Sequence, residues 1–402
     1  MVAAIDIGST KISALIGAAQ EGTVTVLGAG VVPARGVEKA MVADLGEAAE
    51  CVAEAVRLAE EGSGYRIERA YVSVGGCHIQ SRNSRGETAV THALRGVEEE
   101  DAARALAEAS KLSLPAERQI VHVVPRGFWL DGNVLVRDPL GMAAYRMEAE
   151  VHIVTALSSA VRNLTRCVNE ADVEVAGLIL QSLASGESVL TESERDMGVA
   201  LLDIGGGTTD LAVYLSGGIW HTSVIPSGGN HVTSDLAIGL HCPTEVAEDI
   251  KLRFGQCRSG DATMAHDRIR VAGFVGNGAE EVSREEVMRI VEARVEEIFT
   301  LVLRELRRSS YDGLLSAGVV LCGGTANLPG IAPFASEVLD MPVRVVPPRR
   351  VEGLTQVIGD LSQATGVGLL LWGAREAGMT HESSEAGFWS RVGRVFRSVL
   401  PG

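Results

Sequence analysis

Three glycines and two threonines at residues 205–209 form a turn between two apolar runs. The flanking residues 199–204 and 210–214 are rich in β-prone side chains, which predicts a strand, a tight turn and a second strand. The turn offers backbone N–H groups and hydroxyls with little side-chain bulk, and its glycines permit the positive φ angles of an anion-binding nest. It therefore suits a phosphate chain. Asp203 ends the first strand, where a carboxylate could hold a hydrated Mg²⁺ against those phosphates.

A second copy of this pattern occupies residues 2–16. Asp6 corresponds to Asp203, and residues 8–10 correspond to the small and hydroxyl residues of the turn. Two related hairpins indicate two related domains that face one nucleotide. If both turns hold the same phosphate chain, Asp6 and Asp203 converge, and two carboxylates that close require a cation between them. The sequence therefore predicts a metal ion at this place.

A third apolar strand, residues 318–322, ends in Gly323, Gly324 and Thr325. A Pro-Gly pair and a predicted helix from Ile331 follow, so flat backbone is presented where a planar base and a ribose could lie. A single glycine-rich hairpin is more often a structural turn. The three motifs in this order, however, resemble the actin-like ATPase superfamily, which implies an α/β fold.

Composition limits the classes of partner. The 402 residues are 22% charged and 46% hydrophobic, as in an ordinary globular protein, and the formal net charge of −16 together with 4% aromatic residues disfavours nucleic acid. The six cysteines include no Cys-x-x-Cys pair and indicate reduced intracellular thiols. No apolar run reaches eighteen residues, and no basic, apolar leader precedes the first strand. We therefore expect a cytoplasmic chain that does not span a membrane.

Residues 77–155 break the pattern of the first domain. They predict one helix, from about residue 96 to residue 111, and short strands at residues 119–124, 126–130, 134–136 and 146–154. The block contains no phosphate-type turn. It is either a packing insertion or an interaction module, and composition alone does not separate the two.

Three polar residues outside the glycine turns are candidates for the site. Gln181 ends a predicted strand and could orient an attacking water, although a strand-end residue that faces solvent is an equal alternative. Glu248 and Lys251 lie one helical turn apart. Such a pair is usually a solvated ion pair, but beside the third turn it could hold the ribose hydroxyls and flank the adenine.

The end of the chain has a different character. A small, polar stretch at residues 376–386 predicts a flexible linker with a reach of about 18 Å. The following segment places its apolar residues on one helical face and has three arginines and no acid, which favours a helix that lies on a membrane surface over a docked tail. The candidate membrane-contacting residues are Phe388, Trp389, Arg391, Val392, Arg394, Val395, Phe396, Arg397, Val399 and Leu400. A segment this short binds weakly, so durable attachment requires several tails on one assembly.

From Asp6 to Leu400, the chain resembles the FtsA family of actin-like cell-division proteins. Beyond the superfamily motifs, the resemblance rests on residues 33–37, 122–125, 133–147 and 183–185 and on the terminal helix. It implies that ATP and Mg²⁺ lie between the domains, with Asp6 and Asp203 at the metal. It also implies a cofactor site formed by Gly8, Ser9, Thr10, Lys11, Gly205, Gly206, Gly207, Thr208, Thr209, Gly228, Glu248, Lys251, Gly323, Gly324 and Thr325. Only Gln181, Asp203 and Asp210 resemble catalytic groups, so the chain is at most a slow Mg²⁺-dependent ATPase.

The resemblance also implies an architecture and partners. We expect an actin-like two-domain ATPase fold with duplicated mixed β-sheet cores and an inserted α+β subdomain. Its parts are domain 1 at residues 1–76, 156–181 and 355–375, an interaction subdomain at 77–155, domain 2 at 182–354 with a smaller subdomain at about 226–307, a linker at 376–386 and an amphipathic helix at 387–402.

The implied function is to polymerise and to tether the FtsZ ring to the inner face of the cytoplasmic membrane. The implied partners are FtsZ, other copies of the chain, later division proteins of the membrane and anionic lipid. Two alternatives stay open: a PilM-like pilus-assembly adaptor, which should lack a detachable amphipathic helix, and a sugar or acid kinase, which should show a polar substrate pocket with a base.

Overall fold

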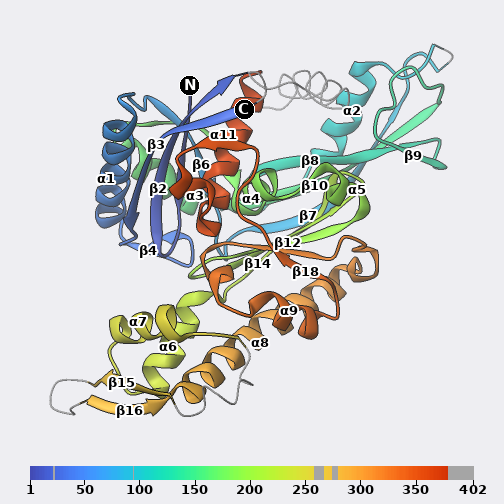
Figure 1. The fold of residues 1–402 in the computed structure, drawn as a ribbon. Helices are drawn as coiled ribbons and strands as arrows, with labels where there is room; N and C mark the ends of the chain where they lie inside the picture. Colours follow the sequence, from blue (N-terminus) through green and yellow to red (C-terminus); the bar gives the residue numbers. More distant parts are fainter. Residues whose placement is uncertain (21–22, 94, 258–266, 274–278, 379–402) are drawn as a thin grey trace.

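A computed structural model describes residues 1–20, 23–93, 95–257, 267–273 and 279–378. Two mixed sheets form the centre of the molecule, and the inserted subdomain and the β15–β16 hairpin lie at opposite ends of it (Figure 1). The candidate membrane-contacting residues, 388–400, lie outside the described residues, and the predicted linker is described only up to residue 378.

The first sheet has six strands in the order β11-β6-β1-β2-β3-β19. Their bounds are β1 (Val2–Ile7), β2 (Lys11–Gln20), β3 (Thr23–Pro33), β6 (Arg69–Val74), β11 (Glu174–Leu180) and β19 (Val351–Gly353). Strands β1, β2 and β3 are antiparallel neighbours, whereas β6, β11 and β19 join in parallel. We expected the chain to return to domain 1 at residue 355. Because β19 pairs with β3, it rejoins the first sheet slightly earlier, at Val351.

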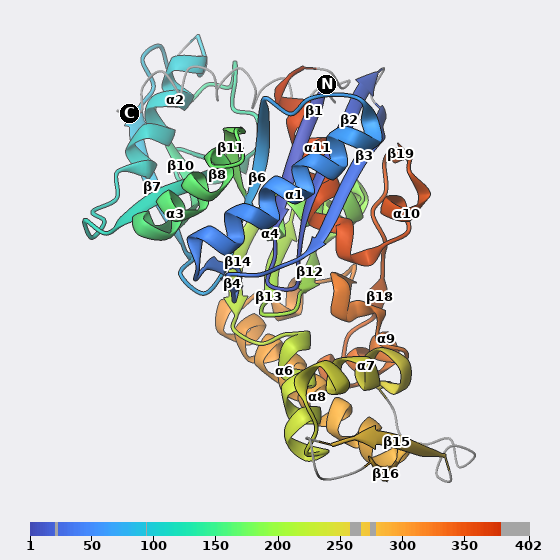
Figure 2. The same ribbon diagram turned by 90° about the vertical axis from the view of Figure 1, so that its left-hand side faces the viewer.

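Helices cover both faces of the first sheet. α1 (Leu45–Ser63) and α3 (Ser158–Asn169) pack together on one face, and α11 (Ala364–Glu376) packs on the other (Figure 2). Asp44 caps α1 by accepting a hydrogen bond from the Glu47 backbone N–H, and Gly64 ends it in the left-handed conformation with φ of 74°. The apolar residues of α1 at helical spacing face the sheet, as the sequence pattern predicts.

The second sheet has the order β14-β13-β12-β17-β18. Its strands are β12 (Val199–Ile204), β13 (Thr209–Leu215), β14 (Gly218–Ile225), β17 (Val319–Cys322) and β18 (Val343–Val345). Alternation along β12 divides the core: Val199 and Leu201 face the first domain, whereas Ala200 and Leu202 face the helices of the second. These helices are α8 (Arg284–Ser309) and α9 (Ile331–Leu339), and α5 (Glu192–Met197) contacts β13.

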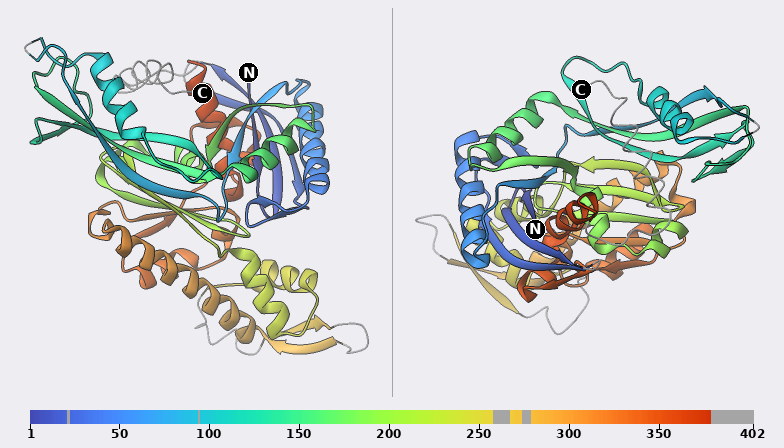
Figure 3. Two further views of the ribbon diagram at one scale, coloured as in Figure 1. Left: turned by 180° about the vertical axis from the view of Figure 1, so that it is seen from behind. Right: turned by 90° about the horizontal axis from the view of Figure 1, so that it is seen from above.

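One pair of helices joins the two sheets. α4 (Gln181–Val189) packs on β12 and β13, α11 packs on β1 and β2, and the two helices lie against each other (Figure 3). A methyl group on Gly368 of α11 would lie 1.8 Å from the Ala184 carbonyl oxygen of α4. Only glycine permits this close approach.

The remaining elements lie outside the two sheets and the inserted subdomain or are short. They are β4 (Val37–Glu38), β5 (Met41–Val42), α6 (Gly229–Gly239), α7 (Thr244–Phe254), β15 (Arg268–Ala272), β16 (Ala279–Ser283), α10 (Thr355–Ile358) and the 3₁₀ turns at Asp312–Leu314, Gly324–Asn327 and Leu361–Gln363. In the described part of the chain, no helix is long and apolar enough to cross a bilayer.

The inserted subdomain is a four-stranded antiparallel sheet covered by one helix. Its elements are β7 (Gln80–Ala89), α2 (Glu99–Ser110), β8 (Arg118–Leu130), β9 (Val134–Val136) and β10 (Arg146–Leu157), with strand order β7-β10-β8-β9. Our prediction of two separate strands at residues 119–124 and 126–130 was wrong. β8 is continuous, and an irregularity in its register with β10 accommodates Pro125 and Arg126.

The inserted subdomain also packs on the second domain. The guanidinium of Arg126 is buried, lies 3.8 Å from the ring centre of Trp220, pairs with Glu150 at 2.9 Å and donates to the Tyr311 hydroxyl at 3.3 Å. Trp220 and Tyr311 meet edge to face. A buried cation thus has a carboxylate from its own subdomain and an aromatic face from the other.

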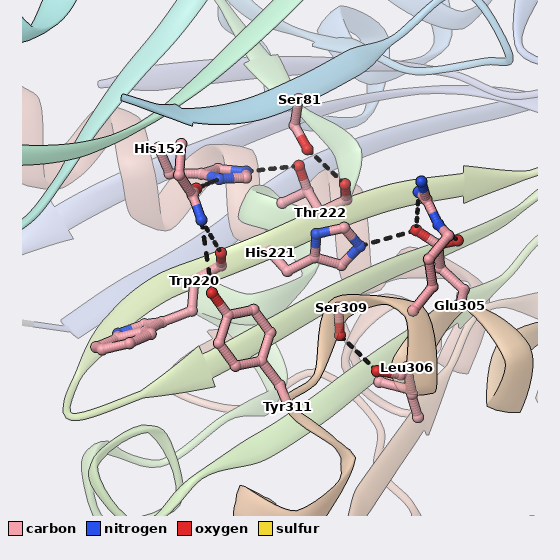
Figure 4. Close-up of polar contacts among 11 residues, drawn as sticks. Ser81, His152, Trp220, His221, Thr222, Glu305, Leu306, Ser309 and Tyr311 are labelled. Carbon is pink, nitrogen blue, oxygen red and sulfur yellow. Dashed lines mark hydrogen bonds and ion pairs between the residues drawn. The ribbon is translucent and has the colours of Figure 1, made fainter. Parts of the chain in front are cut away.

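A chain of polar contacts continues this interface (Figure 4). His152 Nδ1 lies 2.7 Å from Asn83 Oδ1, and its Nε2 lies 2.9 Å from the Thr222 hydroxyl, so the Nδ1–H tautomer satisfies both bonds. Burial, followed by the charges of His221 and Arg126, lowers the pKa of His152 to about 3. The imidazole is therefore neutral, and Ser81 adds a hydrogen bond to the Thr222 carbonyl at 2.7 Å.

Candidate functional site

The two glycine-rich turns lie against each other where the two domains meet. The β1–β2 turn is closed by Gly8 N–H to the Lys11 carbonyl at 3.0 Å, and the β12–β13 turn by Gly205 N–H to the Thr208 carbonyl at 2.9 Å. A methyl group on Gly206 would lie 1.9 Å from Thr10 Oγ1, and the turns therefore meet without room for side chains between them. Apart from these two closing bonds, the N–H groups of residues 9–10 and 206–207 have no backbone acceptor within the described part of the chain, and they could therefore donate to an anionic group.

The other turn residues take part in the same arrangement. A methyl group on Gly207 would lie 2.6 Å from Ser9 Oγ, and Thr10 Oγ1 lies 3.4 Å from Asn230 Oδ1. Thr209 donates to the Ser227 carbonyl at 2.8 Å, which fixes the turn to the start of α6. The hairpins therefore approach each other through the hydroxyl residues that the sequence singled out.

Three buried carboxylates lie behind the turns. Asp203 and Asp210 are cross-strand partners in β12 and β13, and Asp6 is the penultimate residue of β1, close enough for the charge of Asp203 to act on it. Burial raises the pKa of all three; the negative charge of Asp203 adds to the rise for Asp6 and Asp210, and the pKa of Asp210 reaches about 7. Among the described residues, Asp6 Oδ1 and Asp210 Oδ1 have no hydrogen-bond partner. The cluster is short of positive charge.

Hydroxyl groups from distant parts of the chain hold these acids. Asp203 Oδ2 accepts from Ser185 on α4 and from Thr365 on α11, the latter at 3.0 Å. Asp210 Oδ2 accepts from Thr208 at 3.0 Å. Sequence reasoning missed Ser185 and Thr365 as site residues, because they lie 18 and 162 positions from Asp203 and no local pattern connects them.

Lys11 is the cation that faces this cluster. Its ammonium donates to Ser362 Oγ at 2.7 Å, and Ser362 in turn donates to Asp360 at 2.7 Å. Burial lowers the pKa of Lys11, while Asp6, Asp360 and Asp203 oppose that shift. One lysine does not neutralise the three carboxylates, so a further cation fits here.

Gln181 lies at the first position of α4 rather than free at the end of a strand. Its side chain is buried and hydrogen bonds to Asp6, and a methyl group on Gly75 would lie 2.0 Å from Gln181 Oε1. The solvent-facing alternative for Gln181 is therefore wrong. The amide points at the carboxylate cluster, where a positioned water would be needed.

The nucleoside candidates gather at the other end of the β12–β13 turn. Thr325 Oγ1 donates to the Gly205 carbonyl at 2.8 Å, and Lys251 pairs with Glu248 at 2.7 Å and donates to Thr233 Oγ1 at 2.9 Å. Lys251 is buried, whereas Glu248 is partly exposed. The pair is therefore not a solvated surface pair, and Lys251 fixes α7 to α6.

Glycines also lie close to the β12–β13 turn. A methyl group on Gly228 would lie 2.6 Å from the Gly205 carbonyl oxygen, and one on Gly323, whose φ is 88°, would lie 2.4 Å from Asp203 Oδ1. Gly324 begins a 3₁₀ turn, and a methyl group there would make only an ordinary van der Waals contact with Ser362 Cβ at 3.6 Å. Flat backbone is thus presented beside Glu248.

These features fit a Mg²⁺-bound phosphate chain. Within the described residues, no three His, Cys, Asp or Glu side chains enclose a metal ion by themselves. A hard cation beside Asp6, Asp203 and Asp210 would take its remaining oxygen ligands from phosphate and water, as Mg²⁺ commonly does. The unpartnered carboxylate oxygens and the glycine turns supply what both groups require.

Comparison with known families identifies relatives of the whole chain. Residues 200–368 match the model of the cell division protein FtsA, and residues 76–155 match the SHS2 domain that is inserted in FtsA. The chain is 41% identical to the cell division protein FtsA of Pseudomonas aeruginosa, with 94% of this chain and 90% of that protein covered. It is 34% identical to the Escherichia coli K12 protein of the same name, with 98% and 94% covered.

Solved structures share the fold. A PilM–PilN type IV pilus biogenesis complex contains a chain with a TM-score of 0.67 and 16% identity, which covers 92% of this chain and 98% of that one. MreB5 of Spiroplasma citri bound to ADP has a TM-score of 0.55 and 14% identity, with 94% and 97% covered. At such identities the likeness shows the fold alone, which is the actin-like ATPase fold with a mixed α/β core.

Proposed function

Because the chain belongs to the FtsA family of cell division proteins, we propose that it binds ATP with Mg²⁺ between its two domains and tethers the FtsZ ring to the cytoplasmic side of the membrane. The observation that carries the nucleotide part is the group of three buried carboxylates behind two opposed glycine turns. The carboxylates have no evident structural use, because their negative charges raise one another's pKa and so destabilise the folded chain.

Each part of the site has a role in this proposal. The turns donate backbone N–H groups to the phosphates, while Asp6, Asp203 and Asp210 hold the cation directly or through its waters. Glu248 and the backbone around Gly323 and Gly324 contact the nucleoside. Mg²⁺ supplies neutralisation of phosphate charge.

Hydrolysis is a slower, secondary activity in this proposal. Gln181 orients a water near the terminal phosphate, and Asp203 or Asp210 accepts its proton. Burial keeps Gln181 in place against Gly75, but its hydrogen bond to Asp6 must be exchanged before it can hold a water. Nucleotide occupancy rather than turnover then controls self-association.

The membrane part rests on the sequence of residues 387–402. Its apolar face and three arginines suit an anionic bilayer, and a polar linker lets it leave the body of the protein. Because one such segment binds weakly, an actin-like polymer of the chain supplies the avidity. We assign the FtsZ contact to the smaller subdomain at about residues 226–307 and contacts with later division proteins to the inserted subdomain.

Liposome co-sedimentation tests the proposal. The intact chain and a chain truncated after Glu385 are each mixed with anionic vesicles, with ATP and FtsZ added separately. We expect only the intact chain to pellet, to pellet more with Mg²⁺-ATP, and to carry FtsZ with it. A second control is Trp389→Glu, which places a charge on the apolar face but keeps the length of the segment.

Other outcomes point elsewhere. If both lengths of chain stay in the supernatant, the terminal segment is a docked tail and a PilM-like adaptor becomes the better interpretation. If phosphate is transferred from ATP to a sugar or an acid, the kinase alternative holds. Vesicle binding without recovery of FtsZ would refute the tether while leaving the membrane helix in place.

A further inference from the structure

The β4–β5 hairpin lies against the phosphate turns, although sequence reasoning assigned it no role. Its two-residue turn consists of Lys39 and Ala40, with φ of 47° and 58°. Two consecutive left-handed residues are typical of a type I′ turn, for which Asn-Gly is the favoured pair. Lysine and alanine are poor choices on backbone grounds, so the lysine side chain needs another explanation.

The tip of this hairpin contacts both phosphate turns. The Ala40 N–H donates to Ser9 Oγ at 2.7 Å, and a methyl group on Gly207 would lie 3.0 Å from the Lys39 Cα. On its other side, a methyl group on Gly76 would lie 2.7 Å from the Lys39 carbonyl oxygen. The backbone of Lys39 is therefore fixed from three directions, while its side chain is exposed.

The charge of Lys39 acts on the same region as the carboxylate cluster. Burial raises the pKa of the neighbouring Cys77 thiol, the positive charge of Lys39 lowers it, and the negative charge of Asp210 raises it. The pKa of this exposed thiol thus responds to both charges. The charges of Lys39 and Asp210 therefore act on the same thiol, next to the Gly76 backbone that approaches the Lys39 carbonyl.

The position of Lys39 along the β12–β13 turn defines which phosphate it would meet. Thr325 of the nucleoside end contacts Gly205, the first glycine of the turn, whereas Lys39 contacts Gly207, the third. A nucleotide whose base lies beside Thr325 would therefore extend its phosphate chain toward Lys39. A diphosphate is shorter by one charged group at that end.

We propose that Lys39 binds the terminal phosphate of a nucleoside triphosphate, so that the β4–β5 hairpin distinguishes a triphosphate from a diphosphate. This inference rests on the proposed nucleotide binding and adds the residue that senses the terminal phosphate. An ammonium on a rigid hairpin suits this task, because it forms charge-assisted hydrogen bonds only when the last phosphate is present.

The test compares nucleotide binding by variants of the full chain. Lys39→Asn removes the charge but tolerates the left-handed backbone, and Lys39→Arg keeps the charge. Lys111→Asn, at an exposed lysine on the inserted subdomain, is the matched control. Dissociation constants for Mg²⁺-AMPPNP and Mg²⁺-ADP are measured by isothermal titration calorimetry, with thermal unfolding as the check on folding.

We expect Lys39→Asn to raise the dissociation constant for AMPPNP about tenfold and that for ADP less than twofold. For Lys39→Arg and Lys111→Asn, both dissociation constants should stay close to those of the unaltered chain. Equal weakening of both nucleotides, or no change in either, would overturn the assignment to the terminal phosphate. If the unaltered chain binds neither nucleotide, the proposed function itself fails and the Lys39 inference fails with it.

Alkylation of Cys77 gives a second readout that does not depend on turnover. All six cysteines are described, and Cys77 is the exposed one. We expect AMPPNP to slow the alkylation of Cys77 by iodoacetamide in the unaltered chain. At the same nucleotide concentration, the fold decrease in the alkylation rate should be about ten times smaller in Lys39→Asn. Undiminished protection in that variant would contradict the proposal.

Discussion

Replacing Asp210 by asparagine should stabilise the nucleotide-free protein above neutral pH and remove its response to Mg²⁺-ATP. Asp210 is fully buried, one of its oxygens has no partner among the described residues, and its pKa rises from 3.8 to about 7 because of burial and then the charges of Asp203 and Asp6. Asparagine has nearly the same shape, carries no charge and can still accept from Thr208.

The sign and the size of the effect follow from linkage. Between pH 3.8 and about 7, the folded protein holds a proton on Asp210 that the unfolded chain has released, so stability falls as the pH rises through this window. The full penalty above pH 7 is about 4 kcal/mol. Since the asparagine N–H groups also need partners, we expect Asp210→Asn to gain about 2–4 kcal/mol at pH 8 and almost nothing at pH 4.

Thermal unfolding followed by fluorescence measures this difference. Without nucleotide at pH 8, the midpoint of Asp210→Asn should lie about 2–5 °C above that of the unaltered chain, and the gap should close as the pH falls toward 4. With Mg²⁺-ATP, the unaltered chain should gain stability and the variant should not. A lower midpoint for the variant at pH 8 without nucleotide would refute the argument that the buried charge is unfavourable.

Further predictions concern packing, the inserted subdomain and the metal. Gly368→Ala should lower the free energy of unfolding by about 3 kcal/mol or more, because its methyl group would meet the Ala184 carbonyl. Gly62→Ala in α1, with open space around it, should raise that free energy by about 0.5–1 kcal/mol. Equal unfolding midpoints for the two variants would contradict the packing argument. Arg126→Ala should lower the free energy of unfolding by about 3 kcal/mol, because Glu150 loses its buried partner. A decrease below about 1 kcal/mol, measured by urea unfolding, would show that the ion pair is dispensable. Removal of Mg²⁺ by EDTA should abolish most of the stabilisation by ATP. The affinity for Mg²⁺-ATP should fall about tenfold per pH unit below about pH 7, because Asp210 takes up a proton there. An affinity that is flat from pH 6 to 8 would show that protonation of the carboxylates does not control nucleotide binding.

The fold class and the two glycine-rich hairpins were predictable because their signals are local. Each hairpin is encoded within about fifteen residues, and the buried face of α8 repeats at helical spacing. The order of these motifs indicated the superfamily, and short stretches such as residues 33–37 and 122–125 indicated the FtsA family, which the comparison with known relatives confirms.

The features that the sequence did not reveal depend on contacts between residues that are far apart along the chain. β7 (Gln80–Ala89) consists mostly of polar residues with no alternating apolar pattern, and it forms a strand because β10 pairs with it over ten residues. The role of Lys39 is equally non-local, because it depends on turns at Ser9, Gly76 and Gly207 that only the fold brings together.

The geometry around Asp203 depends on both domains at once. Its carboxylate is held by Ser185 from α4, which lies on the second sheet, and by Thr365 from α11, which lies on the first. Since α4 and α11 meet at a glycine contact with no spare room, a shift between the domains must displace at least one of these hydroxyls. Gly368→Ala should therefore weaken Mg²⁺-nucleotide binding even at temperatures where the variant is fully folded. An unchanged affinity in that variant would show that the carboxylate is held by its own strand alone.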